Sequence, residues 1–278
     1  MEVAFFGTSS VWLSDGTSGI LIDGFLSRPS LLRVAFGRIA PDLGRITSAL
    51  ARAGLTRLDA LFVAHSHYDH VMDAPEVVKH LGGSLFGSES TLNVGRGAGL
   101  DDQSMTRIED GDEYTVGAFT VRVLGGVHSP GNRFPGTIAK PLVPPVRASR
   151  YRDGGCFSFL VTHPDGSLLI HPSANVVPHT FDGLDVDVLY LAIGALGAQS
   201  DRFRDDYWRH VVDATRPGLI VPIHWDDFFV SLDRGLRPLP RFFDRFAVAR
   251  AFLDRKSRET GITVRFPEPF EVIRPFVR

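Results

Sequence analysis

Three histidines and an aspartate fall within six residues, His65 to His70, directly after a nearly continuous apolar run at 58–64. The run predicts a strand that is buried on both faces. Side chains two residues apart in an extended segment point to the same side, so His65 and His67 can converge on one ion. Asp69 and His70 stand in the turn that begins the next predicted helix and can face a second ion beside the first. Imidazole and carboxylate ligands favour zinc, manganese or iron over calcium.

Two further histidines stand at the ends of other predicted strands. His128 follows the strand predicted at 120–124, and His224 follows the strand predicted at 219–223. Taken singly, each residue suits a hydrogen-bonded strand end as well as a metal ligand. Together with the six-residue group, they predict a metal site where three strand ends gather at one edge of a sheet assembly.

Composition excludes several other classes of protein. A hydrophobic share of 44% with 21 Phe is too high for intrinsic disorder, and a net charge of −2 gives no electrostatic support for nucleic-acid binding. The single cysteine, Cys156, cannot form an internal disulfide, and the first residues do not resemble a signal peptide. The uncharged stretch 188–200 is too short and too rich in Gly to span a membrane. We therefore expect a cytoplasmic protein that acts on a small molecule, and its oligomeric state stays open.

Strand and helix patterns are mixed along the chain, without a fixed repeat or a linker. Three short apolar runs, at 3–6, 11–13 and 20–22, predict an antiparallel meander. The other predicted elements are helices at 42–53, 71–81, 202–214 and 240–260 and a hairpin of strands at 157–162 and 167–170. This order predicts a single α+β domain over residues 1–278, with two similar halves, sheets inside and helices outside.

Residues 125–155 show little regular pattern and contain five prolines. A loop of this length inside a domain predicts either an active-site lid or a surface excursion. Within it, Arg147, Arg150 and Arg152 suit two interpretations, contact with an anionic substrate group or a solvated basic stretch.

The histidine group resembles the HxHxDH motif of the metallo-β-lactamase superfamily, which His65, His67, Asp69 and His70 match in order. His128 and His224 fall in the order and context of the later ligands of that family. The resemblance implies a four-layer αββα sandwich with metals at one edge, where His65, His67 and His128 hold a first ion and Asp69, His70 and His224 a second. The opening meander and the stretch 87–91 are most similar to the branch that contains L-ascorbate-6-phosphate lactonase.

One departure from the family pattern concerns the metal-bridging aspartate, which is expected after the strand at 167–170. This chain has His171-Pro172-Ser173-Ala174-Asn175 there, with no carboxylate. A weaker second site or a single-metal enzyme becomes plausible, because a bridging anion helps two cations to lie close together. His171 is a candidate for an additional ligand or for a hydrogen-bonded strand end. Asp23 is a candidate for orienting a ligand histidine, or for an ordinary turn residue before Gly24.

The leading hypothesis is a metal-dependent hydrolase with one or two Zn²⁺ ions, Mn²⁺ and Fe²⁺ being alternatives. Such an ion would lower the pKa of bound water to about 7 and supply hydroxide at neutral pH, while Asp69 orients the nucleophile as the catalytic residue. A carboxylic ester or lactone is favoured, since Phe134, Leu142, Val143, Trp225 and Phe228 predict an apolar pocket. The alternatives are a phosphodiesterase and a catalytically inert metal- or ligand-binding protein on the same fold.

Overall fold

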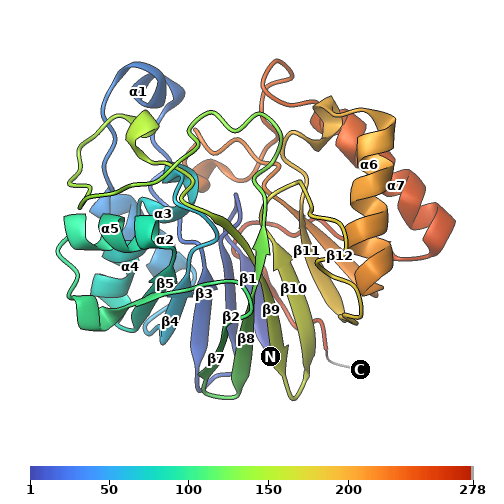
Figure 1. The fold of residues 1–278 in the computed structure, drawn as a ribbon, viewed down its shortest axis with the longest axis horizontal. Helices are drawn as coiled ribbons and strands as arrows, with labels where there is room; N and C mark the ends of the chain where they lie inside the picture. Colours follow the sequence, from blue (N-terminus) through green and yellow to red (C-terminus); the bar gives the residue numbers. More distant parts are fainter. Residues whose placement is uncertain (277–278) are drawn as a thin grey trace.

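The computed structural model describes residues 1–276 and arranges them in four layers (Figure 1). Two seven-stranded sheets lie in the middle of the molecule, and helices cover their outer faces. This arrangement confirms the predicted α+β sandwich. None of the described helices combines the length and the apolar character that crossing a membrane requires.

The first sheet has the strand order β14-β1-β2-β3-β4-β5-β6. Its strands β1 to β3 form the predicted antiparallel meander, and the pairs from β3 to β6 are parallel. Helices α2, α4 and α5 lie on its outer side (Figure 1). Its strands are β1 (Glu2–Phe5), β2 (Val11–Ser14), β3 (Gly19–Ile22), β4 (Ala60–Phe62), β5 (Ser84–Gly87), β6 (Met105–Arg107) and β14 (Val272–Ile273). The helices of this half are α1 (Leu31–Phe36), α2 (Leu43–Arg52), α3 (Tyr68–Val71), α4 (Ala74–Leu81) and α5 (Glu89–Gly97).

The second sheet has the order β13-β12-β11-β10-β9-β8-β7. Strands β7 to β10 are antiparallel neighbours, whereas β10 to β13 run parallel. Helices α6 and α7 lie outside it (Figure 1). The elements are β7 (Glu113–Val116), β8 (Phe119–Gly126), β9 (Cys156–His163), β10 (Gly166–His171), β11 (Val188–Ala192), α6 (Asp201–Trp208), β12 (Leu219–Ile223), α7 (Phe246–Thr260) and β13 (Thr263–Val264).

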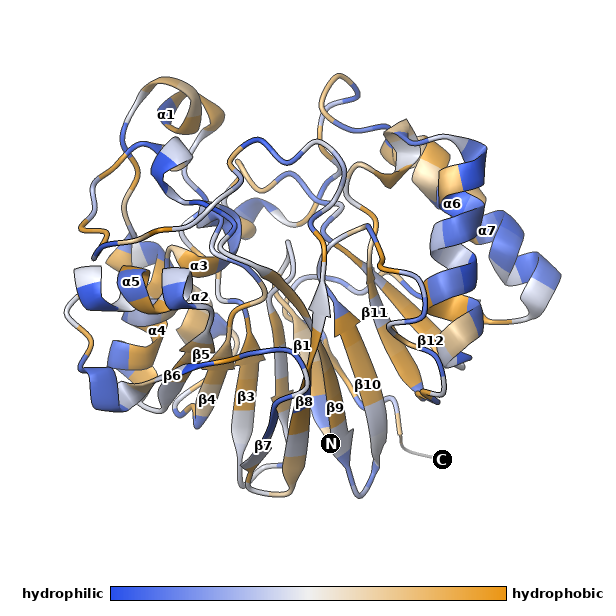
Figure 2. Cartoon of the chain, in the orientation of Figure 1, coloured by the Kyte–Doolittle hydropathy of each residue, from blue (hydrophilic) through white to orange (hydrophobic). Residues whose placement is uncertain are grey.

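The sheets are held together by apolar side chains on their facing sides, and the strands are predominantly apolar in Figure 2. Phe62 of β4 shows how the layers meet: its ring centroid lies 4.4 Å from that of Phe86 in the same sheet and 5.6 Å from that of Phe159 in the facing sheet. All three residues of β4 are buried, as the apolar run predicts. The strand ends that carry polar residues are therefore fixed by a tightly packed core.

Several element boundaries differ from the sequence prediction. The helix expected at 71–81 begins at Ala74 as α4, and a separate short helix, α3, precedes it. Pro75 in the first turn of α4 explains this start, because proline suits that position and not a helix interior. The helix expected from residue 240 begins at Phe246, after Pro238 and Pro240. Helices α1 and α5 and strands β5 to β7 were not predicted.

Candidate metal centre

Three strands end at one edge of the sandwich, and the predicted metal ligands follow them. His65 comes three residues after β4, His128 two residues after β8, and His224 directly after β12. Asp69 and His70 belong to the short helix α3, which begins just after His67. The structure brings all six side chains together in two neighbouring groups.

The first group contains His65, His67 and His128, and one ligand atom from each residue lies within 4.8 Å of the others. The three ring centroids are 4.7 to 4.8 Å apart. Both ring nitrogens of His65 are buried and have no hydrogen-bond partner among residues 1–276. Since an unpaired buried nitrogen is costly, this ring fits a site in which a cation accepts its lone pair.

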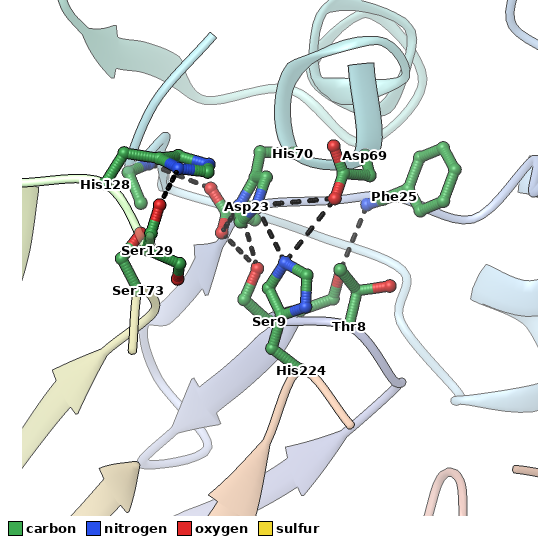
Figure 3. Close-up of polar contacts among 12 residues, drawn as sticks. Thr8, Ser9, Asp23, Phe25, Asp69, His70, His128, Ser129, Ser173 and His224 are labelled. Atoms are coloured by element: carbon green, nitrogen blue, oxygen red, sulfur yellow. Dashed lines mark hydrogen bonds and ion pairs between the residues drawn. The ribbon is translucent and has the colours of Figure 1, made fainter. Parts of the chain in front are cut away.

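The second group contains Asp69, His70 and His224 (Figure 3). Nε2 of His224 lies 3.3 Å from Nε2 of His70 and 3.4 Å from Oδ2 of Asp69. Nε2 of His70 is 3.7 Å from the same carboxylate oxygen. The two groups adjoin each other, because the rings of His65 and His70 are only 3.7 Å apart between centroids. Three ligand atoms that face one another in each group can hold one divalent transition-metal ion.

A buried carboxylate fixes the orientation of His70. Oδ2 of Asp23 lies 2.7 Å from Nδ1 of His70, and the Ser9 hydroxyl donates to the same oxygen at 2.5 Å (Figure 3). The other oxygen of Asp23 accepts the backbone N–H of Ala64 at 2.8 Å. A proton held on Nδ1 leaves the lone pair of Nε2 directed into the second group, which is how outer carboxylates orient metal-binding histidines. The geometry thus favours the orienting interpretation of Asp23 over the turn interpretation.

His224 lies in the left-handed backbone region, with φ of 57°. This conformation costs a residue with a side chain about 1–3 kcal/mol and persists only when its surroundings impose it. Here the N–H of His224 donates to the carbonyl oxygen of Thr8 at 2.5 Å. Asp226 accepts the N–H of Thr8 at 2.7 Å and forms a buried ion pair with Arg28 at 2.6 Å. The loop before β2 therefore supports the backbone that presents His224.

Burial and neighbouring charges keep the two groups in different protonation states. Burial lowers the pKa of His128 to about 4 and, with nearby imidazoles, lowers the pKa of His65 well below its ordinary value. Burial also opposes the charging of His224, but Asp69 outweighs it and raises the pKa of that ring. For Asp69 burial acts upward, yet His70 and His224 hold its pKa far below its usual range. At neutral pH the first group offers uncharged imidazoles, and the second includes an ionised carboxylate.

His171 lies outside both groups, although it also ends a strand. The Ser158 hydroxyl lies 2.7 Å from its Nδ1, and its Nε2 donates to the carbonyl oxygen of Asn175 at 2.8 Å. With both nitrogens engaged, the ring is a hydrogen-bonded strand end and has no lone pair free for a metal. Two residues on, Ser173 lies beside His128 and Ser129 in Figure 3 and lines the same pocket. The stretch 171–175 thus offers no carboxylate after β10, where the family pattern has a bridging aspartate.

A pocket of about 610 Å³ opens beside the two groups. Its walls come from three segments distant in sequence: α1, the 125–155 loop and residues 228–244. The apolar side chains among its lining include Leu31, Val34, Ala35, Phe134, Phe228, Phe229, Leu239 and Phe243. Arg133 and Arg147 line it as well.

The predicted pocket residues are placed only in part as expected. Phe134 and Phe228 line the pocket. Leu142 is instead buried in the helix-covered core of the first half, and Val143 is 65% exposed. Trp225 instead packs against Phe246 in the core, with ring centroids 5.2 Å apart. These three predictions were wrong.

Among the three arginines singled out in the loop, Arg147 lines the pocket, whereas Arg150 and Arg152 are not part of its lining. Sequence reasoning also missed Asp244, which lines the pocket although its residue is only 3% exposed. Neither carboxylate oxygen of Asp244 forms a hydrogen bond with a described residue, and burial raises its pKa. No motif marks this position, so only the folded arrangement reveals it.

Comparison with known proteins agrees with this architecture. Residues 3–138 match the model of the metallo-beta-lactamase superfamily, and the matched range includes five of the six grouped side chains. The chain has the metallo-β-lactamase fold. This fold, which serves metal-dependent hydrolases, confirms the predicted fold family and fits the ligand types of the two groups. The branch of L-ascorbate-6-phosphate lactonase does not appear among the relatives described below.

Solved structures with the metallo-β-lactamase fold align with almost the whole chain. A metallo hydrolase of Ignicoccus hospitalis covers 98% of this chain and 97% of its own, with a TM-score of 0.61 and 15% identity. An isothiocyanate hydrolase from Delia radicum gut bacteria covers 99% of both chains, with a TM-score of 0.60 and 15% identity. At this level of identity the likeness concerns the fold alone.

A curated relative is similar over a shorter stretch. The hydroxyacylglutathione hydrolase of Brucella anthropi is 36% identical over 85 residues, which are 31% of this chain and 30% of the relative. The equivalent enzyme of Brucella ovis shows the same identity over the same length. The chain therefore matches less than a third of the length of these relatives.

Proposed function

We propose that this protein is a metal-dependent hydrolase that cleaves an acyl substrate, an ester, lactone or thioester, in the pocket beside the two ligand groups. The observation that carries the proposal is the convergence of six ligand side chains, in two groups, at the wall of an apolar pocket. The second group adds an ionised carboxylate, Asp69, which can move a proton as well as bind an ion.

The residues fit one or two divalent transition-metal ions, and zinc is our first choice. The unpaired nitrogens of His65 are the clearest sign, since a buried imidazole without partners is rare unless it binds an ion. His65, His67 and His128 would hold the first ion, and Asp69, His70 and His224 the second. A bound ion would supply a water of pKa about 7 and polarise the scissile carbonyl.

Asp69 is the group best suited to handle a proton. Its carboxylate is ionised at neutral pH, because His70 and His224 hold its pKa down. Oδ2 can accept a hydrogen bond from the attacking water and so orient it, then pass a proton to the leaving group. Asp23 and Ser9 keep His70 in place during this step.

An acyl substrate is favoured by the apolar walls of the pocket. Phe134 and Phe228 face the ligand groups directly, with ring centroids 6.3 Å from His67 and 5.9 Å from His224. The 125–155 loop forms one wall, which is consistent with the lid that we expect there. The partial similarity to hydroxyacylglutathione hydrolase adds thioesters to the esters and lactones that the sequence favours.

A phosphodiester is the second candidate, because Arg133 and Arg147 line the pocket and are suited to an anionic group. The absence of a carboxylate at 171–175, where a bridging aspartate is expected, counts against it, since phosphodiester cleavage commonly uses two close metal ions.

The test is a hydrolysis panel performed on protein of measured metal content. Purified protein is loaded with zinc, manganese or iron, its metal is quantified, and it is assayed on a lactone, an aryl ester, a thioester and a phosphodiester. We expect turnover of at least one acyl substrate and no turnover after chelation. For variants of the ligand histidines, His80→Ala is the matched control, because His80 is an exposed histidine of α4 away from the site.

Two results would contradict the proposal. Full-length protein that binds no transition metal at neutral pH would exclude both ligand groups. Metal-loaded protein that cleaves only the phosphodiester would assign the site to the second candidate.

A further inference from the structure

The mouth of the pocket is formed by three surface stretches that share an unusual composition. We call residues 29–41, 127–152 and 234–245 the rim segments, since each contributes side chains to the pocket lining. In Figure 1 they lie together at the upper end of the molecule, above the sheets. Their charge and their apolar side chains differ from those of the remaining surface.

The rim segments concentrate positive charge. They contain eleven of the 30 basic residues of the chain and one of its 32 acidic residues, so their formal charge is +10 and that of all other residues is −12. The one acidic residue, Asp244, is buried. The basic side chains are Arg33, Arg38, Arg133, Lys140, Arg147, Arg150, Arg152, Arg234, Arg237, Arg241 and Arg245.

These basic groups are also largely free of partners within the described chain. Only Arg237 forms an ion pair, with Asp227 at 3.5 Å. Elsewhere, by contrast, most arginines of residues 1–276 lie within 4 Å of a carboxylate; α6 and α7 are typical. The rim thus presents unneutralised cations, which attract an anionic partner over several ångströms.

The rim also carries the most exposed large apolar side chains of the described residues. Phe36 is 83% exposed, Phe242 80%, Leu32 72% and Val143 65%. Helix α1 has the sequence Leu-Leu-Arg-Val-Ala-Phe, and none of its residues is buried. Leu31, Val34 and Ala35 line the pocket, while Leu32 and Phe36 are left in solvent.

We propose that the rim docks on an anionic lipid surface, with Leu32, Phe36 and Phe242 inserted among the lipids and the arginines at the level of the headgroups. Protruding apolar side chains ringed by unpaired basic ones are the combination that binds such interfaces, whereas a soluble polyanion would need only the charges. Docking in this way turns the pocket mouth toward the lipid. The proposal concerns binding and stands independently of the hydrolase proposal.

The test is sedimentation of the full-length protein with vesicles. We expect binding to vesicles of phosphatidylcholine mixed with phosphatidylglycerol, little binding to phosphatidylcholine alone, and release by high salt. Phe36→Ser with Phe242→Ser should weaken partitioning, and Arg33→Gln with Arg38→Gln should weaken it roughly tenfold or more. None of these four residues lines the pocket, so cleavage of a small soluble substrate should be unchanged.

The matched control comes from the C-terminal part of α7. Arg258 is exposed there and forms no ion pair with a described residue, so Arg258→Gln repeats the arginine change away from the rim. It should leave vesicle binding intact. Absence of binding to the mixed vesicles, or equal losses in rim and control variants, would overturn the proposal. Retention on heparin without vesicle binding would overturn it too and would assign the rim to a soluble polyanion.

Discussion

The two ligand groups are neighbours, yet they are built in different ways. The first group consists of imidazoles alone. His67 and His128 each have a ring nitrogen within hydrogen-bond distance of a backbone carbonyl oxygen, but His65 makes no hydrogen bond to a described residue. The second group contains a carboxylate, and the Asp23 and Thr8 contacts fix its two histidines from outside. A histidine held by its surroundings is oriented before an ion binds, whereas the ring of His65 lacks such a contact and gains one from the ion.

The largest effect is expected from the first group. His65→Ala should reduce kcat/KM on the best substrate by at least about a thousandfold, since it removes a ligand that no other described residue replaces. The measurement is steady-state kinetics together with metal content. Circular dichroism should show a folded protein, and His80→Ala should retain activity. A variant with unchanged kcat/KM would remove His65 from the machinery.

His171 is a buried histidine that belongs to neither ligand group, and we expect it to affect stability and not metal binding. Its pKa is lowered to about 4 by burial. The unfolded chain therefore takes up a proton before the folded one, and stability falls as the pH drops from about 6.5 to about 4, by about 3 kcal/mol from this ring. Urea unfolding of the metal-free protein across this range should show the loss.

His171→Gln keeps a neutral side chain that can pair with Ser158 and Asn175. It should flatten the acid limb of the stability curve without changing metal content. An unchanged acid limb would mean that the protonation of other groups governs it.

A smaller effect is expected from changing Asp23, the carboxylate that orients His70 in the second group. Asp23→Asn should weaken metal affinity at that group by about 10- to 100-fold, because the ring of His70 loses its orienting carboxylate. The first group should retain its affinity, since Asp23 does not contact it. Titration of metal-free protein with zinc can separate the two steps. Equal weakening of both steps would show that the groups act as one unit.

The smallest expected difference is in the pH at which each group releases its metal. Protons compete with metal ions for imidazole nitrogens. The pKa of His224 is raised, so on acidification this ring is protonated before His128, whose pKa is about 4. Metal should therefore leave the second group at a higher pH than the first. The measurement is metal content after dialysis over a pH series, which should fall in two steps. A single step would show that both groups lose metal at the same pH.

The sequence predicts the parts of the site that depend on local geometry. His65 and His67 converge because alternate residues of an extended segment share a side, and this can be inferred without coordinates. The rule does not extend to Trp225, because the backbone of His224 before it is left-handed and not extended, and the pocket prediction failed there. The meander of β1 to β3 was equally predictable, since turn residues separate its apolar runs.

Other features depend on distant segments and leave no local pattern. Strand β7, Glu113–Val116, alternates polar and apolar residues, but its four exposed and half-buried residues are too short a pattern to stand out in the sequence. Helix α1 has only six residues, all apolar except Arg33, so periodicity cannot reveal it. Asp244 joins the pocket only because residues 228–244 fold over β12, and an aspartate after two phenylalanines has no signature of its own.

The pairing of β14 with β1 has a consequence for biosynthesis. β1 is synthesised first, but one of its edges is covered only by Val272–Ile273, almost the whole chain later. During translation the nascent sheet therefore exposes an apolar strand with free N–H and C=O groups, a template for association with other chains. Truncations or fusions that disturb residues 272–273 should accordingly lower the yield of recoverable protein before they alter the chemistry of the opposite edge.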